Sequence, residues 1–105
     1  MFGLVVRFSL RPGAAEGFDR LVAGTVPHIV SSEPGTLLYL THTVDGDPDA
    51  RIFYEVYRDR AAFDEHERQD HVRAFLAARE EFLAGPPRVE FVTVAGGKGM
   101  PAGAR

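Results

Sequence analysis

Apolar residues fill every second position at the start of the chain, from Phe2 to Leu10, and a Pro-Gly pair follows at positions 12 and 13. A period of two is typical of a β-strand that buries one face. The sequence therefore predicts a first strand over residues 2–10.

The next apolar positions recur at spacings of three and four, which predicts a helix from Ala14 to Ser32 with one apolar face. The residues on that face are Phe18, Leu21, Val22, Val26, Ile29 and Val30. Glu33-Pro34-Gly35 then ends the helix.

Two segments rich in β-branched and aromatic residues follow, over residues 36–44 and 51–57. Asp45-Gly46-Asp47-Pro48-Asp49 lies between them and has the composition of a turn. The pattern predicts a β-hairpin.

The last third of the chain predicts two helices and a strand. Asp59 is a candidate N-cap for a short helix that carries Phe63 and His66, and Asp70 is a candidate cap for a second helix that reaches Leu83. Gly85-Pro86-Pro87 ends the second helix. Residues 89–95 read as a final strand, and the Gly-rich residues 96–105 as a flexible tail.

The order of these elements is β-α-β-β-α-β, with the second helix in two parts, which is the ferredoxin-like pattern of the α+β class. We expect one domain over residues 1–95, with an antiparallel sheet and helices on one of its faces.

Along the third strand both faces are mostly apolar. One set is Ile52, Tyr54 and Val56, and the other is Phe53, Glu55 and Tyr57. The helices can cover only one set, so the pattern predicts that a second copy of the chain covers Ile52, Tyr54 and Val56, giving a homodimer.

Composition narrows the function classes. The 105 residues carry a formal net charge of −3, which does not favour binding to nucleic acid or to an anionic membrane. The chain contains no Cys, which excludes thiol chemistry, thiolate zinc sites and iron–sulfur clusters. The amino terminus has a charge at Arg7 and no small-residue cleavage site, so we expect neither a signal peptide nor a membrane span, and a cytoplasmic location.

Glu55 is the first candidate for chemistry, because a carboxylate on a strand buried on both sides needs a partner. Arg79 lies seven residues after Val72, two helical turns along the predicted helix, and could supply that partner. Three interpretations stay open: a structural ion pair, an arginine that reaches solvent, or an anion-binding or acid–base pair inside a pocket.

Histidines supply two further candidates. His42 shares a strand face with Leu38 and Leu40, so we expect its ring to be at least half buried, near the helices or the dimer contact. His66 lies three residues after Phe63 on one helix face. Each histidine is either structural or a general acid or base. His66 and His71 are five residues apart on different helix faces, so no metal site is predicted.

Several segments together resemble a known family. They are Arg11-Pro12-Gly13, Glu33-Pro34-Gly35-Thr36-Leu37, Phe53-Tyr54-Glu55-Val56-Tyr57-Arg58-Asp59, Ala62-Phe63 with His66, and Pro86-Pro87. In this order and spacing the chain resembles, over residues 2–95, the antibiotic biosynthesis monooxygenase domain. That family has the dimeric α+β barrel fold and includes quinol and anthrone monooxygenases.

The resemblance implies a pocket between sheet and helices in which a substrate hydroxyl is deprotonated and the electron-rich aromatic substrate itself reduces O2. It implies no flavin, haem or metal cofactor. Such a site needs a base, a donor that stabilises the anion and an apolar cavity.

Carried over by position, the resemblance places Phe53, Tyr57 and Phe63 where polyketide-oxidising members have Asn, Trp and Tyr. His42 matches a histidine on their second strand, and their helix arginine falls between Arg73 and Arg79. The resemblance thus implies a cofactor-independent monooxygenase for a small hydroxylated aromatic compound of the quinol or anthrone type.

In this interpretation His42 or His66 accepts the proton and Arg79 stabilises the anion. Phe53, Glu55, Tyr57 and Phe63 bind the substrate. Two alternatives stay open: an isomerase of a small carbonyl compound on the same fold, and a non-catalytic dimeric module for small-molecule binding or stress response.

Overall fold

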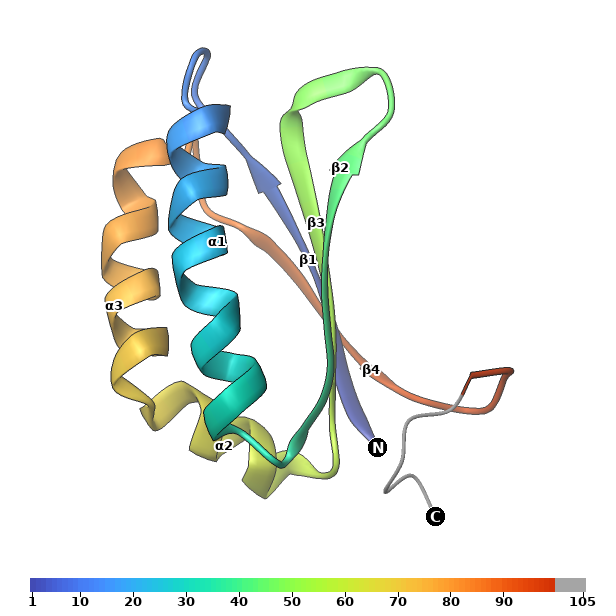
Figure 1. Cartoon of the computed structure of the whole chain (residues 1–105). Helices are drawn as coiled ribbons and strands as arrows, with labels where there is room; N and C mark the ends of the chain where they lie inside the picture. Colours follow the sequence, from blue (N-terminus) through green and yellow to red (C-terminus); the bar gives the residue numbers. More distant parts are fainter. Residues whose placement is uncertain (100–105) are drawn as a thin grey trace.

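The computed structural model describes residues 1–99 and confirms the predicted α+β class: four antiparallel strands form one sheet, and helices cover one of its faces (Figure 1). The elements are β1 (Phe2–Ser9), α1 (Ala15–Ser32), β2 (Thr36–Val44), β3 (Asp47–Tyr57), α2 (Arg60–Arg68), α3 (Asp70–Ala78), the 3-10 turn η1 (Arg79–Phe82) and β4 (Arg88–Thr93). The strand order is β2-β3-β1-β4. No helix in this part of the chain is both long enough and apolar enough to cross a bilayer.

Strand pairing sorts the side chains onto two faces, because residues directly opposite each other point the same way. Glu55 pairs with Leu4 and Tyr39, and Leu4 pairs with Phe91, so these four side chains form one row under the helices. The residues between them point to the other side of the sheet, here called the open face. The open face comprises Leu38, Leu40, His42, Ile52, Tyr54, Val56, Val5, Arg7, Arg88, Glu90 and Val92.

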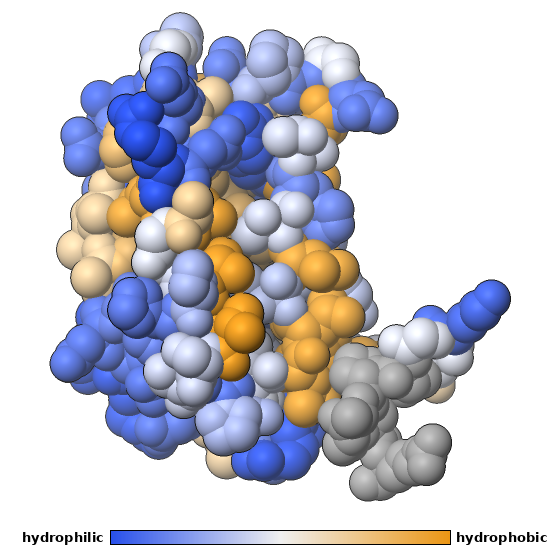
Figure 2. All heavy atoms as spheres, in the orientation of Figure 1, coloured by the Kyte–Doolittle hydropathy of each residue, from blue (hydrophilic) through white to orange (hydrophobic). Residues whose placement is uncertain are grey.

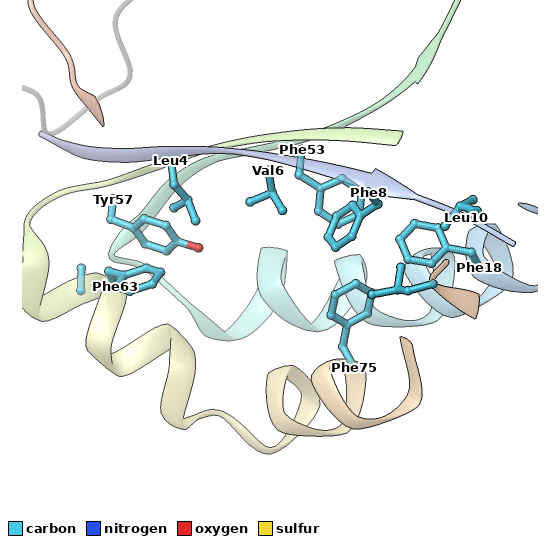
Figure 3. Close-up of a cluster of buried hydrophobic side chains, with 11 residues drawn as sticks. Leu4, Val6, Phe8, Leu10, Phe18, Phe53, Tyr57, Phe63 and Phe75 are labelled. Atoms are coloured by element: carbon cyan, nitrogen blue, oxygen red, sulfur yellow. The ribbon is translucent and has the colours of Figure 1, made fainter. Parts of the chain in front are cut away.

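The core lies between the sheet and the helices (Figure 3). Leu4, Val6 and Phe8 of β1 and Phe53 of β3 point toward the helical layer, where Phe18, Phe63 and Phe75 meet them. Burying one such large side chain contributes about 1.5–3 kcal/mol, which makes this layer the main source of stability.

The helix boundaries differ from the prediction at two places. Asp59 caps α2 as expected and accepts from the Ala62 N–H at 2.9 Å. Asp70, in contrast, is the first residue of α3, and Gln69 is the cap, without a side-chain hydrogen bond. The predicted helix also ends at Ala78, because the chain then tightens through η1 to bring Leu83 into a backbone bridge with Leu10.

The hairpin turn is shorter than predicted. Strand β3 begins at Asp47, so the turn consists of Asp45 and Gly46, where Gly46 has a φ of +80° that favours glycine. The register then shifts between Thr43 and Val44. Arg51 fixes the irregular stretch by donating from Nη1 to the carbonyls of residues 48 and 50.

The structure describes only part of the carboxyl-terminal segment, for which the sequence predicted a last strand and a flexible tail. Strand β4 ends at Thr93, two residues before the predicted end, and residues 94–99 form neither helix nor strand. The rest of the predicted flexible tail, residues 100–105, lies outside the described residues.

Candidate functional site

A cavity of about 140 Å³, here called the inner cavity, lies between the sheet and helices α2 and α3. Most of its lining is apolar, with Leu4, Phe53, Phe63 and Phe75 among the walls. The polar side chains that line it are Thr25, Tyr39, Glu55, His66, Glu67 and Arg79. A small apolar chamber with a few converging polar groups is the usual form of a small-molecule site.

Glu55 is the carboxyl group of the inner cavity and is only 5% exposed. Its Oε1 accepts a hydrogen bond of 2.5 Å from the hydroxyl of Tyr57. Burial raises the pKa of Glu55 to about 7, and the charges of Glu67 and Glu33 act in the same direction, while the Tyr57 hydrogen bond and Arg79 oppose them. A carboxyl group with such a pKa can both accept and release a proton near neutral pH.

His66 lies between two buried carboxyl groups. Its Nδ1 is 2.5 Å from Glu33 Oε1, and its Nε2 is 3.9 Å from Glu55 Oε1. The second distance is too long for a hydrogen bond, but a single oxygen atom placed between the two groups could bond to both. The His66 ring stacks beside Phe63, its neighbour on the same helix face, and lines the inner cavity.

Glu33 holds His66 from the carboxyl end of α1. It is 7% exposed and accepts a hydrogen bond of 2.7 Å from the Thr36 hydroxyl. Its second oxygen, Oε2, is hydrogen-bonded to Nε2 of His71, at the start of α3. Both oxygens of this carboxyl group thus have partners, as a buried carboxylate requires.

Arg79 reaches the inner cavity from the start of η1. Its guanidinium lies over the rings of Phe8 and Phe75, with 5.6 and 5.9 Å from Cζ to the ring centroids. Its Nε is buried without a hydrogen-bond partner among the described residues. Of the three interpretations left open, the direct ion pair with Glu55 is not found among the described residues, where the Tyr57 hydroxyl donates to that carboxyl group.

The three predicted wall residues have different positions. Phe53 and Phe63 line the inner cavity. Tyr57 is fully buried beneath it and touches the site through its hydrogen bond to Glu55. Burial raises the pKa of Tyr57 far above the usual range, as does the neighbouring Glu55, so this hydroxyl stays protonated and remains a donor.

His42 does not reach the inner cavity. Its side chain is exposed on the open face, paired with Ile52, and its Nδ1 is 2.9 Å from the Ile52 carbonyl oxygen. Within a single chain the helices do not cover His42, because they lie on the opposite face of β2. Its expected burial at a dimer contact stays a prediction.

His42 also borders a second, open groove of about 460 Å³ between α1 and β2. Figure 2 shows apolar side chains along both the helix and the sheet on this side of the molecule. The salt bridge of Arg51 with Asp19 contributes to the lining of this groove.

Among residues 1–99, no three His, Asp or Glu side chains are arranged to ligate a metal ion. His66 and His71 do come together across two helices, but each bonds to a different oxygen of Glu33.

The sequence did not predict three residues as part of the site: Tyr39, Glu33 and His71. Tyr39 alternates with Leu38 and Leu40, and either face of β2 could have carried the helices, so only the fold selects it. Glu33 lies in a Glu-Pro-Gly turn that looks solvent-exposed. Its partners lie 33 and 38 residues further along the chain, and no local signal identifies them.

Comparison with known proteins agrees with this architecture. A model of the antibiotic biosynthesis monooxygenase family matches residues 1–78. An uncharacterized protein of Synechocystis sp. is 30% identical over 64 residues, which span 61% of this chain but only 44% of that protein.

Solved structures of similar proteins share the fold. A protein of Caulobacter crescentus CB15, whose name carries the same family description, superposes with a TM-score of 0.86 at 23% identity over 90% of each chain. Rv0793 from Mycobacterium tuberculosis gives a TM-score of 0.84 at 25% identity, over 92% of this chain and 97% of that chain.

Proposed function

Because this chain belongs to the antibiotic biosynthesis monooxygenase family, we propose that it is a cofactor-independent monooxygenase that oxidises a small hydroxylated aromatic compound with O2. The observation that carries the proposal is that Glu55 and His66 lie side by side in the wall of one small, mostly apolar cavity, with 3.9 Å between Oε1 and Nε2.

The size of the inner cavity favours a substrate with one aromatic ring. An apolar cavity of about 150 Å³ is known to hold one benzene molecule. The inner cavity, at about 140 Å³, is of that size and is walled by the rings of Phe53, Phe63 and Phe75. We therefore propose a monocyclic quinol in preference to a three-ring anthrone.

Glu55 and His66 are suited to remove the hydroxyl proton of such a substrate. An oxygen atom beside the line that joins Oε1 and Nε2 lies within hydrogen-bond distance of both atoms. The pKa of Glu55, raised to about 7 by burial, gives a base that is half ionised near neutral pH. His66 is fixed by Glu33 with its Nε2 toward the cavity.

Arg79 is suited to stabilise the phenolate. Its buried Nε has no partner among the described residues, so an anion in the inner cavity would supply the missing hydrogen bond. The deprotonated ring then passes electrons to O2. One oxygen atom stays on a ring carbon and the other leaves as water, so that hydroquinone and O2 give hydroxybenzoquinone and water.

A second candidate function uses the same pair of groups. Two acid–base residues that lie side by side in the wall of one cavity could move a proton between neighbouring carbons of a small carbonyl compound, which is an isomerisation without O2. Oxygen consumption distinguishes the two activities.

The proposal is tested by recording O2 uptake by the purified chain with hydroquinone, an anthrone and no substrate. We expect uptake with hydroquinone above its spontaneous oxidation and little with the anthrone. Glu55→Gln should lower the rate by roughly 10²-fold or more, the usual contribution of a general base. Glu65→Gln, on the exposed side of α2, is the matched control and should keep the wild-type rate. Uptake that is equal in all variants and in buffer would refute the proposal.

A further inference from the structure

Glu33 joins two imidazole rings that lie at different depths. His66 is a buried neighbour of the inner cavity, with 6% of its side chain exposed. His71 has 15% of its side chain exposed, and its ring stacks beside exposed His28 at 5.6 Å between centroids. The carboxyl group between the two rings is itself only 3% exposed.

These groups form a continuous line from the cavity to the surface. Nε2 of His66 faces Glu55, while its Nδ1 bonds to Oε1 of Glu33. Oε2 of Glu33 bonds to Nε2 of His71, so the remaining ring nitrogen, His71 Nδ1, is free to meet water. The Thr36 hydroxyl fixes the orientation of the Glu33 carboxyl group.

A purely structural role does not require this arrangement. A buried carboxylate needs hydrogen-bond donors, and any donor would satisfy it. Here both oxygens bond to imidazole rings, and each ring has a second nitrogen that points away from Glu33 and can also carry a proton. The base in the inner cavity, in turn, needs an exit for the proton that it takes from every substrate molecule. Glu55 is only 5% exposed, and a substrate in the inner cavity that it lines would cover what remains.

We propose that Glu33 and His71 form a proton relay that carries the proton of the Glu55 and His66 pair to solvent. The use of this relay in turnover rests on the proposed function. The role of the relay in proton exchange rests on the line of hydrogen bonds alone.

The transfer moves protons only and no electrons. His66 gains a proton at Nε2 and passes the proton on Nδ1 to Oε1 of Glu33. Before the transfer the carboxyl proton of Glu33 lies on Oε2 and His71 carries its single proton on Nδ1. The Oε2 proton moves onto Nε2 of His71, and His71 releases its Nδ1 proton to water. Each group gains one proton and loses one, and reorientation of the hydrogen bonds prepares the next transfer.

The first test needs no substrate. In proton NMR of the intact chain, the exchange rate of the His66 Nδ1 proton with water is measured, with the signal assigned through its loss in His66→Gln. His71→Gln keeps a hydrogen-bond partner for Glu33 but cannot pass a proton on. Since positioned proton transfer is worth roughly 10²- to 10⁴-fold in rate, we expect this exchange to slow by about tenfold or more in His71→Gln.

His28→Gln is the matched control, because it removes an imidazole beside His71 that takes no part in the line of hydrogen bonds. It should leave the exchange rate unchanged. Equal exchange rates in wild type and His71→Gln, with the hydrogen bond of His66 intact, would overturn the relay.

The second test uses O2 uptake with hydroquinone. His71→Gln should lose about tenfold or more in kcat, and imidazole buffer should restore the rate as its concentration rises, since a small base can replace the missing carrier. A structural defect would not respond to buffer concentration, so loss without rescue would also contradict the relay. Absence of uptake in the wild type would refute the proposed function instead, and the NMR measurement would still decide the relay.

Discussion

Glu55 is almost fully buried, and within residues 1–99 its direct hydrogen-bond donor is a neutral hydroxyl, that of Tyr57. Burial therefore dominates, and the pKa of Glu55 rises to about 7. A charged partner in direct contact would have lowered the pKa and removed the group from the range in which it can work as a base.

This raised pKa predicts how stability depends on pH. The pKa of Glu55 is 4.5 in the unfolded chain and about 7 in the folded chain. Below pH 4.5 the group is protonated in both states and does not change the free energy of unfolding. As the pH rises from 4.5 to about 7, the unfolded chain ionises first, so the folded state loses stability. The full loss is roughly 3 kcal/mol, at about 1.4 kcal/mol per pKa unit. Glu55→Gln, which cannot ionise, should escape it.

Urea unfolding at pH 4.5 and pH 8 measures this effect. We expect the free energy of unfolding of Glu55→Gln to improve by roughly 3 kcal/mol relative to wild type between the two pH values. Exposed Glu65→Gln should show no such change. A difference between wild type and Glu55→Gln that stays constant with pH would show that Glu55 titrates normally.

Arg79 illustrates the opposite case, a half-buried charge without a direct counter-ion in the described part of the chain. Its guanidinium rests on Phe8 and Phe75 and leaves Nε unpaired. Replacing an unpaired buried polar group by an apolar one is often neutral for stability. We therefore expect Arg79→Leu to change the free energy of unfolding by less than about 1 kcal/mol.

The same variant should lower hydroquinone-dependent O2 uptake by roughly 10²- to 10³-fold, the usual loss when a donor to a developing anion is removed. Arg73→Leu, on the exposed side of α3, is the control for both measurements. A large loss of stability in Arg79→Leu would mean that the arginine is structural.

At the level of elements, Arg51 ties the sheet to α1. Its Nε and Nη2 donate to the two oxygens of Asp19 at 2.9 and 3.0 Å, and its Nη1 holds two carbonyls of the irregular start of β3. Hydrogen bonds from a charged donor contribute about 1.5–3 kcal/mol each, although Asp19 is half exposed and its share is reduced by solvent.

Arg51→Met should therefore cost about 2–4 kcal/mol in chemical denaturation, because it leaves the buried carbonyl of Ala50 without this donor and breaks the salt bridge to Asp19. The matched control is Arg20→Met, which removes only an exposed ion pair with Glu16 and should cost less than about 0.5 kcal/mol. If both variants lose the same small amount, Arg51 does not hold the hairpin.

The elements were largely predictable from sequence, because strands and helices of this chain follow the period of their apolar residues. The alternation from Phe2 onward and the N-cap at Asp59 identified β1 and α2 correctly. The end of α3 was not predictable in this way, since the bridge between Leu10 and Leu83 tightens the chain and depends on tertiary structure.

The site was predictable only in part, for a related reason. His66 and Glu55 stood out because polar groups among buried residues need partners. The position of His42, in contrast, depended on which face of β2 the helices cover, and period two alone leaves both faces possible. The contacts of Glu33 exist only after three helices have packed together.

At the level of the whole molecule, the helices cover one side of the sheet and the open face presents apolar side chains. Leu40 is 47% exposed there, and Val92 is 36% exposed. Val56, one of the three residues expected to be covered by a partner, is already buried within one chain. We propose that a second copy covers the rest of this face, because a large apolar patch favours association.

Leu40→Glu should shift a homodimer to monomer in analytical ultracentrifugation, because it places a charge on the apolar part of this face. Val30→Glu is the matched control, since Val30 is 79% exposed on α1, on the other side of the molecule. A dimer that tolerates Leu40→Glu as well as Val30→Glu would exclude the open face as the interface.

Monooxygenase activity is tested most directly by following the two oxygen atoms of O2. Purified chain is incubated with hydroquinone under isotopically labelled O2, and the product is analysed by mass spectrometry, with Glu55→Gln and a reaction without protein alongside. If the chain is a monooxygenase, each hydroxybenzoquinone carries one labelled oxygen atom and the other is in water. Glu55→Gln should lower the rate of this reaction by roughly 10²-fold. Product without label, or labelled product formed equally fast by Glu55→Gln, would contradict the proposal.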